Sequence, residues 1–414
     1  MALKYRFLLI ALGLMIFVVV SPVLILFARG YKINFKTWEI VKTGSLVIRT
    51  EPNRADIYLD DKIQESDTPA TLRFLLPKDY NVTVSKDDYQ SWTKRLNIQE
   101  EIVTWANLNR EYITLFLKNP QRENTKLTQT VAQEPFHNRL VFVSDDKLYL
   151  VKTEGGDVED IQENANWLNN KNNAQLLSQE NLYYLLAMGR SLPFTPDEIL
   201  NLKKIQAGDN RTVLLTGKTL TVLNRQNQIT LMVPNVIDFV LENNDLWLIE
   251  TSSLRLVNLN NNSPDLIRTA LPLNNSGKLI RGDGRIFMII SNTLYVVSEK
   301  LDRIADGVAQ AYWDNNSKQL IYGNDHEIFI FNPTSFRSDL ILRSSSTVSN
   351  AVLNGQTGYV FFTNEGKIKA VEIDGRDHRN IYTITDAGSG FAITKDGKKL
   401  FVYDATSIKT YKIR

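Results

Sequence analysis

The chain has 414 residues, of which 43% are hydrophobic and 23% are charged, so it has ample material for two or more packed domains. A net charge of +2 without a clustered basic face argues against a protein that binds nucleic acid. The absence of cysteine excludes disulfides, thiolate catalysis and cysteine-ligated metal sites.

The first predicted element is an apolar helix over residues Phe7–Phe27, a stretch without a single charged residue. Sixteen of its 21 residues are Leu, Ile, Val or Phe, and on an insertion scale they favour transfer into a bilayer by roughly 5–10 kcal/mol. As a helix the stretch is about 31 Å long, close to the ~30 Å hydrocarbon core of a membrane. We therefore expect residues 7–27 to span a lipid bilayer as an uncleaved anchor.

A cleaved signal peptide is the main alternative to this anchor. Signal peptides have apolar regions of about 7–15 residues that end in a small-x-small cleavage site, and the sequence after Phe27 lacks such a site. The flanking basic residues do not decide the orientation because they lie on both sides: Lys4 and Arg6 before the stretch, and Arg29, Lys32, Lys36 and Lys42 after it. The short head of residues 1–6 favours an N-terminus inside the cell and C-terminal domains outside it.

A small antiparallel β domain is predicted over residues 43–118, after a membrane-proximal segment of residues 28–42. Its hydrophobic residues recur with a period of two, the pattern of strands with one buried face. Leu46 and Ile48 alternate with less apolar neighbours, and Val82 and Val84 do the same. Turn residues rich in Pro, Asp and Asn separate these runs.

The same stretch resembles the PEGA domain of bacterial and archaeal surface proteins. The resemblance lies in an ordered set of a Gly-led strand, a Pro-x-x-Ala turn, a Thr-Pro pair, a Leu-x-Pro turn with Tyr, and a final Tyr and Trp. These positions are Gly44, Pro52, Ala55, Thr68, Pro69, Pro77, Tyr80, Tyr89 and Trp92. The resemblance implies a structural or surface-associated module without a catalytic centre. We interpret Tyr80, Tyr89 and Trp92 as core residues, with a ligand-stacking platform as the alternative.

Four residues depart from the PEGA pattern at positions where the family has glycine: Arg54, Asp61, Lys78 and Asp88. Asp tolerates a positive φ angle reasonably well, whereas Arg and Lys do so poorly. We therefore expect the turns at Arg54 and Lys78 to take a different type.

A β-propeller is predicted over residues 135–414, after a polar linker of residues 119–134. A unit of apolar strands and polar turns repeats, and the strand after the first turn of each unit starts at Val213, Leu246, Ile286, Leu320, Tyr359 and Leu400. These starts are 33 to 41 residues apart, close to the repeat of about 40–45 residues in propellers of four-stranded blades. Such blades bury their faces against one another.

The number of blades depends on residues 163–205, which interrupt the repeat. Treated as a partly helical insertion, with a helix beginning at Thr195 and Pro196, they leave seven blades. Treated as a degenerate blade, they give eight. The last unit lacks one strand, and a strand from Lys126–Ala132 is predicted to complete it and close the propeller.

The sequence contains few groups that would support catalysis. Its three histidines, His137, His326 and His378, do not have the close spacing of a zinc site. Neither a G-x-S-x-G motif nor a glycine-rich phosphate loop is present. We therefore expect neither a metal nor a cofactor, and no enzymatic activity.

Carboxylates are the one abundant group, and nearly all lie where strands turn: Asp145, Asp146, Asp283, Asp314, Asp325, Asp374, Asp377 and Asp396. A pair of them facing each other would suit a glycosidase or lyase, which is an alternative function. A structural surface-layer component is another. The favoured hypothesis is a membrane-anchored extracytoplasmic binding or scaffold protein of the bacterial envelope, with an envelope protein or glycan as partner and no nucleic acid.

Overall fold

The computed structural model divides the chain into two compact units, which are described separately. Unit 1 consists of Met1–Lys118, Asp374–Asn380 and Arg414, and unit 2 of Asn119–Ile373 and Ile381–Ile413. The structure describes residues 2–34, 38–107, 112–123, 139–144, 147–152, 158–160, 202–207, 211–226, 228–242, 244–259, 267–271, 276–298, 300–314, 317–388, 390–394, 396–403 and 408–414.

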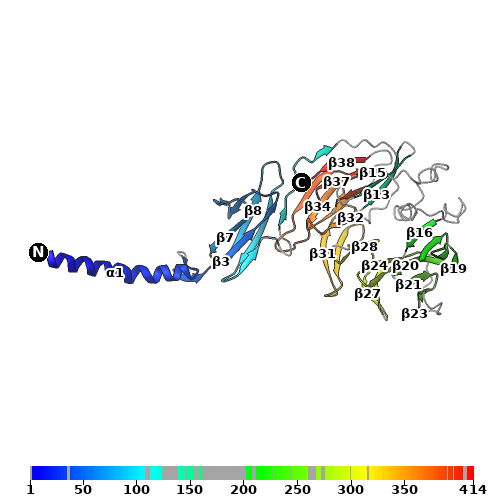
Figure 1. Cartoon of the computed structure of the whole chain (residues 1–414), viewed down its shortest axis with the longest axis horizontal. Helices are drawn as coiled ribbons and strands as arrows, with labels where there is room; N and C mark the ends of the chain where they lie inside the picture. Colours follow the sequence, from blue (N-terminus) through cyan, green and yellow to red (C-terminus); the bar gives the residue numbers. More distant parts are fainter. Residues whose placement is uncertain are drawn as a thin grey trace. The chain divides into compact units, whose positions relative to one another are not determined.

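Unit 1 begins with α1 (Ala2–Ala28), the predicted apolar helix (Figure 1). Within the described residues it is the one helix long and apolar enough to cross a membrane, with a mean hydropathy of 2.7 over Ala11–Ala28. None of that window is buried inside the protein. The helix ends at Ala28 and is followed by Gly30, whose φ of 85° is the left-handed conformation typical of the residue after a helix. The Gly30 amide donates to the Phe27 carbonyl at 3.0 Å.

The β domain of unit 1 is built from a hairpin and two small sheets. The hairpin pairs β1 (Tyr31–Asn34) with β2 (Glu39–Lys42). One sheet has the order β10 (Val103–Trp105), β3 (Gly44–Ile48), β7 (Ala70–Leu75), and β11 (Ile113–Thr114) pairs with β4 (Thr50–Glu51). The other sheet has the order β6 (Lys62–Ile63), β5 (Asp56–Leu59), β8 (Lys78–Ser85), β9 (Trp92–Ile98).

The predicted alternation of buried and outward residues is confirmed in this domain. Leu46 and Ile48 are buried, as are Val82 and Val84, while the residues between them are not. The prediction of a purely antiparallel domain is wrong in one respect, since β10 pairs parallel with β3 and β11 parallel with β4. β10 follows β9, a strand of the other sheet, so no tight hairpin forces it to run antiparallel to its neighbour.

Unit 2 is mainly β, and its described strands form seven antiparallel sheets, in which neighbours are consecutive along the chain except for one pair in the last sheet (Figure 1). In chain order these are β13 (Arg139–Ser144), β14 (Lys147–Lys152), β15 (Val158–Asp160); β16 (Leu202–Ala207), β17 (Arg211–Thr216), β18 (Thr219–Asn224), β19 (Ile229–Val233); β20 (Val236–Glu242), β21 (Asp245–Glu250), β22 (Ser253–Asn258), β23 (Ile267–Ala270); β24 (Gly277–Gly282), β25 (Arg285–Ile290), β26 (Thr293–Val297), β27 (Leu301–Ala305); β28 (Gln310–Asp314), β29 (Gln319–Gly323), β30 (Glu327–Asn332), β31 (Arg337–Arg343); β32 (Val348–Asn354), β33 (Tyr359–Asn364), β34 (Lys367–Glu372), β35 (Ile381–Asp386); and β36 (Gly390–Ile393), β37 (Lys399–Tyr403), β38 (Ile408–Lys412).

The predicted repeat corresponds to these sheets. All six strand positions inferred from the repeat fall in the second strand of a sheet, namely β17, β21, β25, β29, β33 and β37. This strand is the most regular part of the repeat because strands pair with it on both sides, so its side chains are apolar and largely buried. The fold is the predicted propeller, with seven blades among the described residues.

Two predicted boundaries in this unit are corrected. The strand that completes the last sheet is β12 (Gln121–Glu123), which pairs antiparallel with β38. It lies ahead of the predicted Lys126–Ala132, which is outside the described residues. β12 is polar, so hydrophobic periodicity gave no signal for it. The predicted insertion of residues 163–205 is too long, because β16 begins at Leu202 and pairs with β17. The helix predicted from Thr195 lies outside the described residues up to residue 201.

Polar side chains tie successive sheets of the propeller together. Asp238 on β20 is buried, and its Oδ1 accepts a hydrogen bond from Lys204 Nζ on β16 at 2.9 Å. Its Oδ2 accepts one from the Leu279 amide on β24 at 2.6 Å. One carboxylate thereby connects three consecutive sheets, and its charge is balanced by an ammonium group where little water reaches it.

Replacing Asp238 with Ala is therefore expected to destabilise unit 2 by about 3 kcal/mol, because a partly buried ammonium and a buried backbone amide both lose their acceptor. Urea unfolding of the full chain, monitored by hydrogen exchange of the amides in β24, measures this loss of stability. The control is Asp283→Ala, which breaks an exposed 2.7 Å ion pair with Lys318 and is expected to cost less than about 1 kcal/mol. Equal effects of the two substitutions would contradict the prediction.

Candidate functional site

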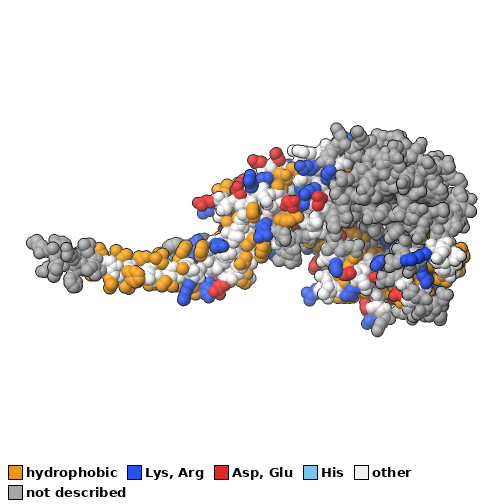
Figure 2. All heavy atoms as spheres, in the orientation of Figure 1, with side chains coloured by type: hydrophobic (Ala, Val, Ile, Leu, Met, Phe, Trp, Pro, Cys, Tyr) orange, Lys and Arg blue, Asp and Glu red, His pale blue; other side chains and the backbone are white. Residues whose placement is uncertain are grey.

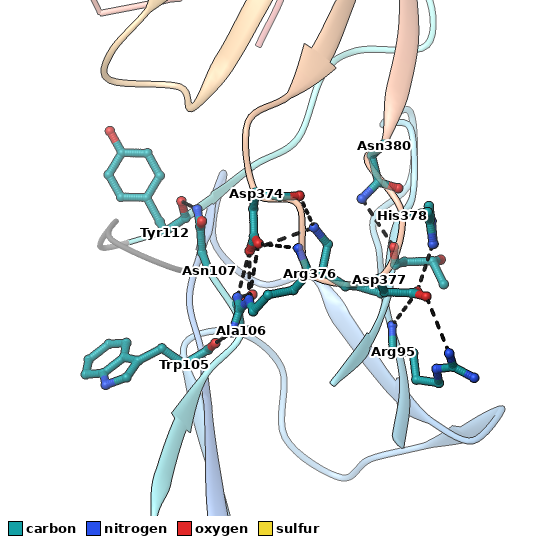
Figure 3. A network of polar contacts seen from close by, with 12 residues as sticks. Arg95, Trp105, Ala106, Asn107, Tyr112, Asp374, Arg376, Asp377, His378 and Asn380 are labelled. Carbon is teal, nitrogen blue, oxygen red and sulfur yellow. Dashed lines mark hydrogen bonds and ion pairs between the residues drawn. The ribbon is translucent and has the colours of Figure 1, made fainter. Parts of the chain in front are cut away.

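A network of charged and polar side chains in the described part of unit 1 involves the segment Asp374–Asn380, which we call the clasp segment (Figure 3). Its sequence, DGRDHRN, connects β34 to β35. Although these two strands belong to unit 2, the clasp segment itself is part of unit 1. Its partners in unit 1 are residues of β9 and the stretch around β10, so it joins positions some 280 residues apart in the sequence.

Lys94 is the buried cation of this network. It lies on β9 between Trp92 and Leu96, at a strand position where alternate side chains are apolar and buried. Its side chain has no exposed surface, and its Nζ donates a hydrogen bond to the Asp374 carbonyl at 2.8 Å. The same Nζ lies 3.8 Å from Asp374 Oδ2 and 5.8 Å from the centre of the Trp92 ring. A fully buried ammonium requires such partners, since its desolvation is otherwise too costly.

Besides its contact with Lys94, the carboxylate of Asp374 accepts hydrogen bonds from Arg376 (Figure 3). Arg376 Nη2 donates to Asp374 Oδ2 at 2.7 Å, and its Nε lies 3.2 and 3.1 Å from the two carboxylate oxygens. The guanidinium also donates to the carbonyls of Trp105 at 3.0 Å and Ala106 at 2.9 Å. The planar fork of arginine suits this combination of one carboxylate and two carbonyls.

Asp377 and Asn380 cover the outer edge of β9, which pairs on its other side with β8. The Arg95 amide donates to Asp377 Oδ2 at 3.0 Å, and Asn380 Nδ2 donates to the Thr93 carbonyl at 3.2 Å. An uncovered strand edge would present these backbone groups to any extended chain. The clasp segment therefore occupies an edge that would otherwise be available for strand pairing.

The charges and hydrogen bonds around the clasp segment keep the carboxyl groups of Asp374 and Asp377 ionised. Burial alone would raise the pKa of Asp374, but the hydrogen bonds from Arg376 and the charge of Lys94 outweigh burial and lower it. The pKa of Asp377 is lowered chiefly by the hydrogen bond from the Arg95 amide, with a further contribution from His378. A carboxylate with a lowered pKa is a poor proton donor at neutral pH. This chemistry suits a structural connection rather than general acid catalysis.

The predicted motif residues of the PEGA-like domain lie in its turns and core. Gly44 opens β3, and a Cβ atom there would lie 2.3 Å from the Gln99 carbonyl oxygen, so that only glycine fits. Thr68 is buried, and its Oγ1 accepts a hydrogen bond from the Ala55 amide at 3.0 Å. Pro52 follows a cis peptide bond.

The remaining motif residues include three aromatic side chains. Trp92 is fully buried and Tyr80 is 8% exposed, and both belong to the main hydrophobic core of unit 1. Tyr89 is partly buried and packs against that core. Pro69 follows a second cis peptide bond, and Pro77 lies between β7 and β8. The burial of Trp92 and Tyr80 leaves neither ring open to a stacked ligand, which favours the core interpretation for these two residues.

The four residues that replace glycine behave in two ways. Arg54, Asp61 and Asp88 have φ angles of 60°, 63° and 67°, so the chain keeps the glycine-like conformation at these positions. The expectation of a different turn at Arg54 is therefore wrong. At Lys78 the expectation is confirmed, because this residue begins β8 in an extended conformation. There its Nζ forms an ion pair with Asp60 at 2.5 Å.

The carboxylates of Asp314 and Asp396 serve local turns, that of Asp283 forms an exposed ion pair, and Asp325 contributes a backbone contact. Asp314 accepts a hydrogen bond from the Ser317 amide at 2.7 Å, and Asp396 accepts one from the Lys398 amide at 3.0 Å. Asp283 pairs with Lys318, and the Asp325 carbonyl accepts a hydrogen bond from the Val348 amide. Asp145, Asp146 and His137 lie outside the described residues. Among the residues that the structure describes, no three His, Asp or Glu side chains form a group that could hold a metal ion.

Sequence analysis identified Asp374 and Asp377 only as turn residues and did not identify Lys94. One signal was available for Lys94. It occupies the inward position of β9 between Trp92 and Leu96, where a charged residue requires a buried partner. The sequence does not reveal which of the many carboxylates provides it.

Replacing Lys94 with Met is expected to destabilise unit 1 by about 3 kcal/mol, because the Asp374 carbonyl and carboxylate lose a buried donor. Urea unfolding of the full chain, monitored by pulsed hydrogen exchange in β9, reports this change. The matched control is Lys78→Met on the neighbouring β8, which breaks an exposed ion pair and is expected to cost less than about 1 kcal/mol. A Lys94→Met effect as small as that of the control would show that the buried contact is not stabilising.

The clasp segment is also expected to make unit 1 sensitive to acid. The pKa of Asp374 is lower in the folded state than the ordinary value of 3.8. Its contribution is therefore fully present above that value and is lost as the pH falls through the lowered pKa. The urea midpoint of β9 should fall over this acidic range in the wild-type chain and fall less in Asp374→Asn. An equal fall of the urea midpoint with pH in the wild-type chain and in Asp374→Asn would contradict the prediction.

Comparison with known proteins gives one match in sequence and several in fold. A family model of the PEGA domain matches residues 43–112, and no curated protein matches the chain. Hsv2 from Kluyveromyces lactis aligns at 9% identity and a TM-score of 0.42 over 69% of this chain and 93% of its own.

The extracellular domain of BT4673 from B. thetaiotaomicron aligns at 12% identity and a TM-score of 0.40 over 71% of this chain, which spans only 40% of that protein. PorZ of Porphyromonas gingivalis, a bacterial surface component of the type-IX secretion system, aligns at 13% identity and a TM-score of 0.34 over 70% of this chain and 38% of its own. Residues 43–112 thus match the PEGA domain, within a longer chain whose second unit is a propeller.

Proposed function

We propose that the protein is a membrane-anchored, extracytoplasmic binding or scaffold protein of a bacterial envelope. In this proposal α1 spans the cytoplasmic membrane with its short N-terminal head inside the cell. The PEGA-like domain and the propeller lie outside, and the propeller binds a partner. The observation that carries the proposal is an apolar helix without a buried face that is followed directly by folded β structure.

The exposure of α1 supports the membrane anchor. Hydrophobic side chains cover its described surface (Figure 2), and none of Ala11–Ala28 is shielded by the rest of the protein. So much exposed apolar surface is not stable in water, whereas in a bilayer it is favourable. A helix pairs its backbone groups within itself, as the hydrocarbon core demands, and membrane helices tolerate a carbonyl freed by a proline such as Pro22. The inside position of the N-terminus follows from the short head before a long apolar segment.

The construction of the propeller supports a binding role over a catalytic one. Its sheets are tied together by buried side chains such as Asp238, which makes them a rigid platform for the connecting loops. The described turn carboxylates Asp314 and Asp396 accept hydrogen bonds from their own turns. Acids engaged in this way stabilise the turns and are not prepared for proton transfer.

An envelope protein is the partner that the surface of unit 2 favours. Several large apolar side chains are exposed on strands at the outer ends of the sheets, among them Met232 on β19, Leu340 on β31 and Ile381 on β35. Phe336 is exposed in the turn before β31. Apolar and aromatic side chains of this kind are enriched in protein–protein interfaces.

Single-cysteine labelling on intact bacterial cells tests the proposed topology, because the chain has no cysteine of its own. Ser335→Cys, at an exposed turn of the propeller, is expected to react with a membrane-impermeant maleimide before lysis. Ala2→Cys in the N-terminal head is expected to react only after lysis, and its presence in the mature protein excludes cleavage of the helix. Protection of Ser335→Cys until lysis would overturn the extracytoplasmic location.

The same Ser335→Cys variant, labelled with a photo-crosslinker on intact cells, identifies the partner. We expect one envelope protein to be captured by the anchored chain and not by a variant that lacks residues 1–29. Capture of a glycan instead would contradict a protein partner and identify a carbohydrate as the ligand. Hydrolysis of an envelope glycan by the purified full chain would contradict the non-enzymatic role.

A further inference from the structure

The end of the β domain next to α1 carries a group of exposed apolar side chains, which we call the collar. Its members are Trp38, Ile40, Phe74, Ile102 and Val103. In the described part of unit 1 outside α1, only two other large apolar side chains are exposed, Ile63 and Trp105. Exposed apolar residues in this domain are therefore concentrated where the apolar helix meets it.

Hydrogen bonds fix the collar to the end of α1. The Thr43 amide and hydroxyl donate to the Gly30 carbonyl at 2.9 and 2.7 Å, directly after the helix. The Glu101 amide in turn donates to the Thr43 carbonyl at 3.1 Å, and Lys42 Nζ pairs with Glu101 at 2.7 Å. These contacts join the helix end, the β1–β2 hairpin and the turn before β10.

Ring stacking adds a second connection. The rings of Phe27 on α1 and Phe74 on β7 stack with centroids 5.0 Å apart and an interplanar angle of 17°. Lys32 Nζ on β1 lies within 3.5 Å of the Phe74 carbonyl, and β1 also packs against α1. The collar is consequently held at the level of the last turn of the helix, with little freedom to move away from it.

The composition of the collar matches the interface of a lipid bilayer. Trp38 is 79% exposed at the tip of the hairpin, and Ile40 and Val103 are 55% and 54% exposed. Tryptophan is enriched at the depth of the lipid headgroups, where its ring contacts acyl chains and its N–H remains hydrated. Arg29 and Lys32 are exposed close to the end of α1 in sequence, and basic side chains are attracted to anionic headgroups.

We propose that the collar inserts into the headgroup region of the bilayer that α1 spans, so that the PEGA-like domain rests on the membrane surface. This inference depends on the membrane anchor of the proposed function. It goes beyond the anchor because it assigns a lipid-binding surface to the β domain. The consequence is that the domain is held in one orientation on the membrane, whereas a domain tethered by a flexible linker would tumble above it.

Site-directed spin labelling of the full chain tests this proposal. The chain is reconstituted in nanodiscs of phosphatidylethanolamine and phosphatidylglycerol, with one cysteine introduced at a time and carrying a nitroxide. Collisions with oxygen and with a water-soluble nickel complex report depth. Trp38→Cys and Ile40→Cys are expected to show an oxygen-to-nickel accessibility ratio several-fold higher than Asp87→Cys. Asp87 is an exposed residue beyond the far end of β8, roughly 30 Å along the strand from Lys78.

A label at Val18→Cys in the middle of α1 separates the two ways in which the test can fail. A lipid-buried label at position 18 combined with labels at positions 38 and 40 as hydrated as the one at 87 would overturn the collar and leave the anchor intact. A hydrated label at position 18 would overturn the anchor, and the collar with it. A buried label at 18 and intermediate depths at 38 and 40 would establish the collar.

Discussion

A strand at the edge of a sheet presents unpaired backbone N–H and C=O groups, and this chain covers its edges with segments that come from far along the sequence. The outer edge of β9 is covered by Asp377 and Asn380 of the clasp segment. The last sheet of the propeller is completed by β12, which precedes its partner β38 by almost 300 residues. Uncovered edges would invite pairing with other chains. β12 and the clasp segment are therefore as important to the fold as its repeated strands.

Buried charges make these distant contacts specific. Lys94 and Asp238 are both buried on strands, and each is satisfied by partners from other segments of the chain. An apolar pair would tolerate sliding between the packed elements, whereas an ammonium or carboxylate without its partner is strongly unfavourable. In unit 1 the buried Lys94 binds the clasp segment. In unit 2 the buried Asp238 connects three consecutive sheets.

The junction between α1 and the β domain of unit 1 also depends on a few specific contacts. Gly30 follows the helix, and Thr43 binds the exposed carbonyl of that glycine. The stacked rings of Phe27 and Phe74 then continue the apolar surface from the helix to the β domain. A rigid junction of this kind transmits the orientation of a membrane helix to the domain that follows it. The proposed collar extends this junction into the lipid headgroups.

Features that depend on neighbours along the chain were predictable from the sequence. The apolar run before Ala28, the alternation of Leu46 and Ile48, and the recurring second strands of the propeller all follow from local hydrophobic periodicity. These signals are strong because each residue's environment repeats every two residues in a strand, and because a membrane helix needs about twenty apolar residues in succession.

Only the tertiary structure decided which distant segments meet. The parallel pairing of β10 with β3, the position of the closing strand β12 and the union of Lys94 with Asp374 have no local signature. The charge of Lys94 requires a buried partner, but many carboxylates in the chain satisfy that requirement equally well in sequence. Which carboxylate pairs with Lys94 depends on the loop that the folded sheets bring to the edge of β9. That is a property of the assembled fold.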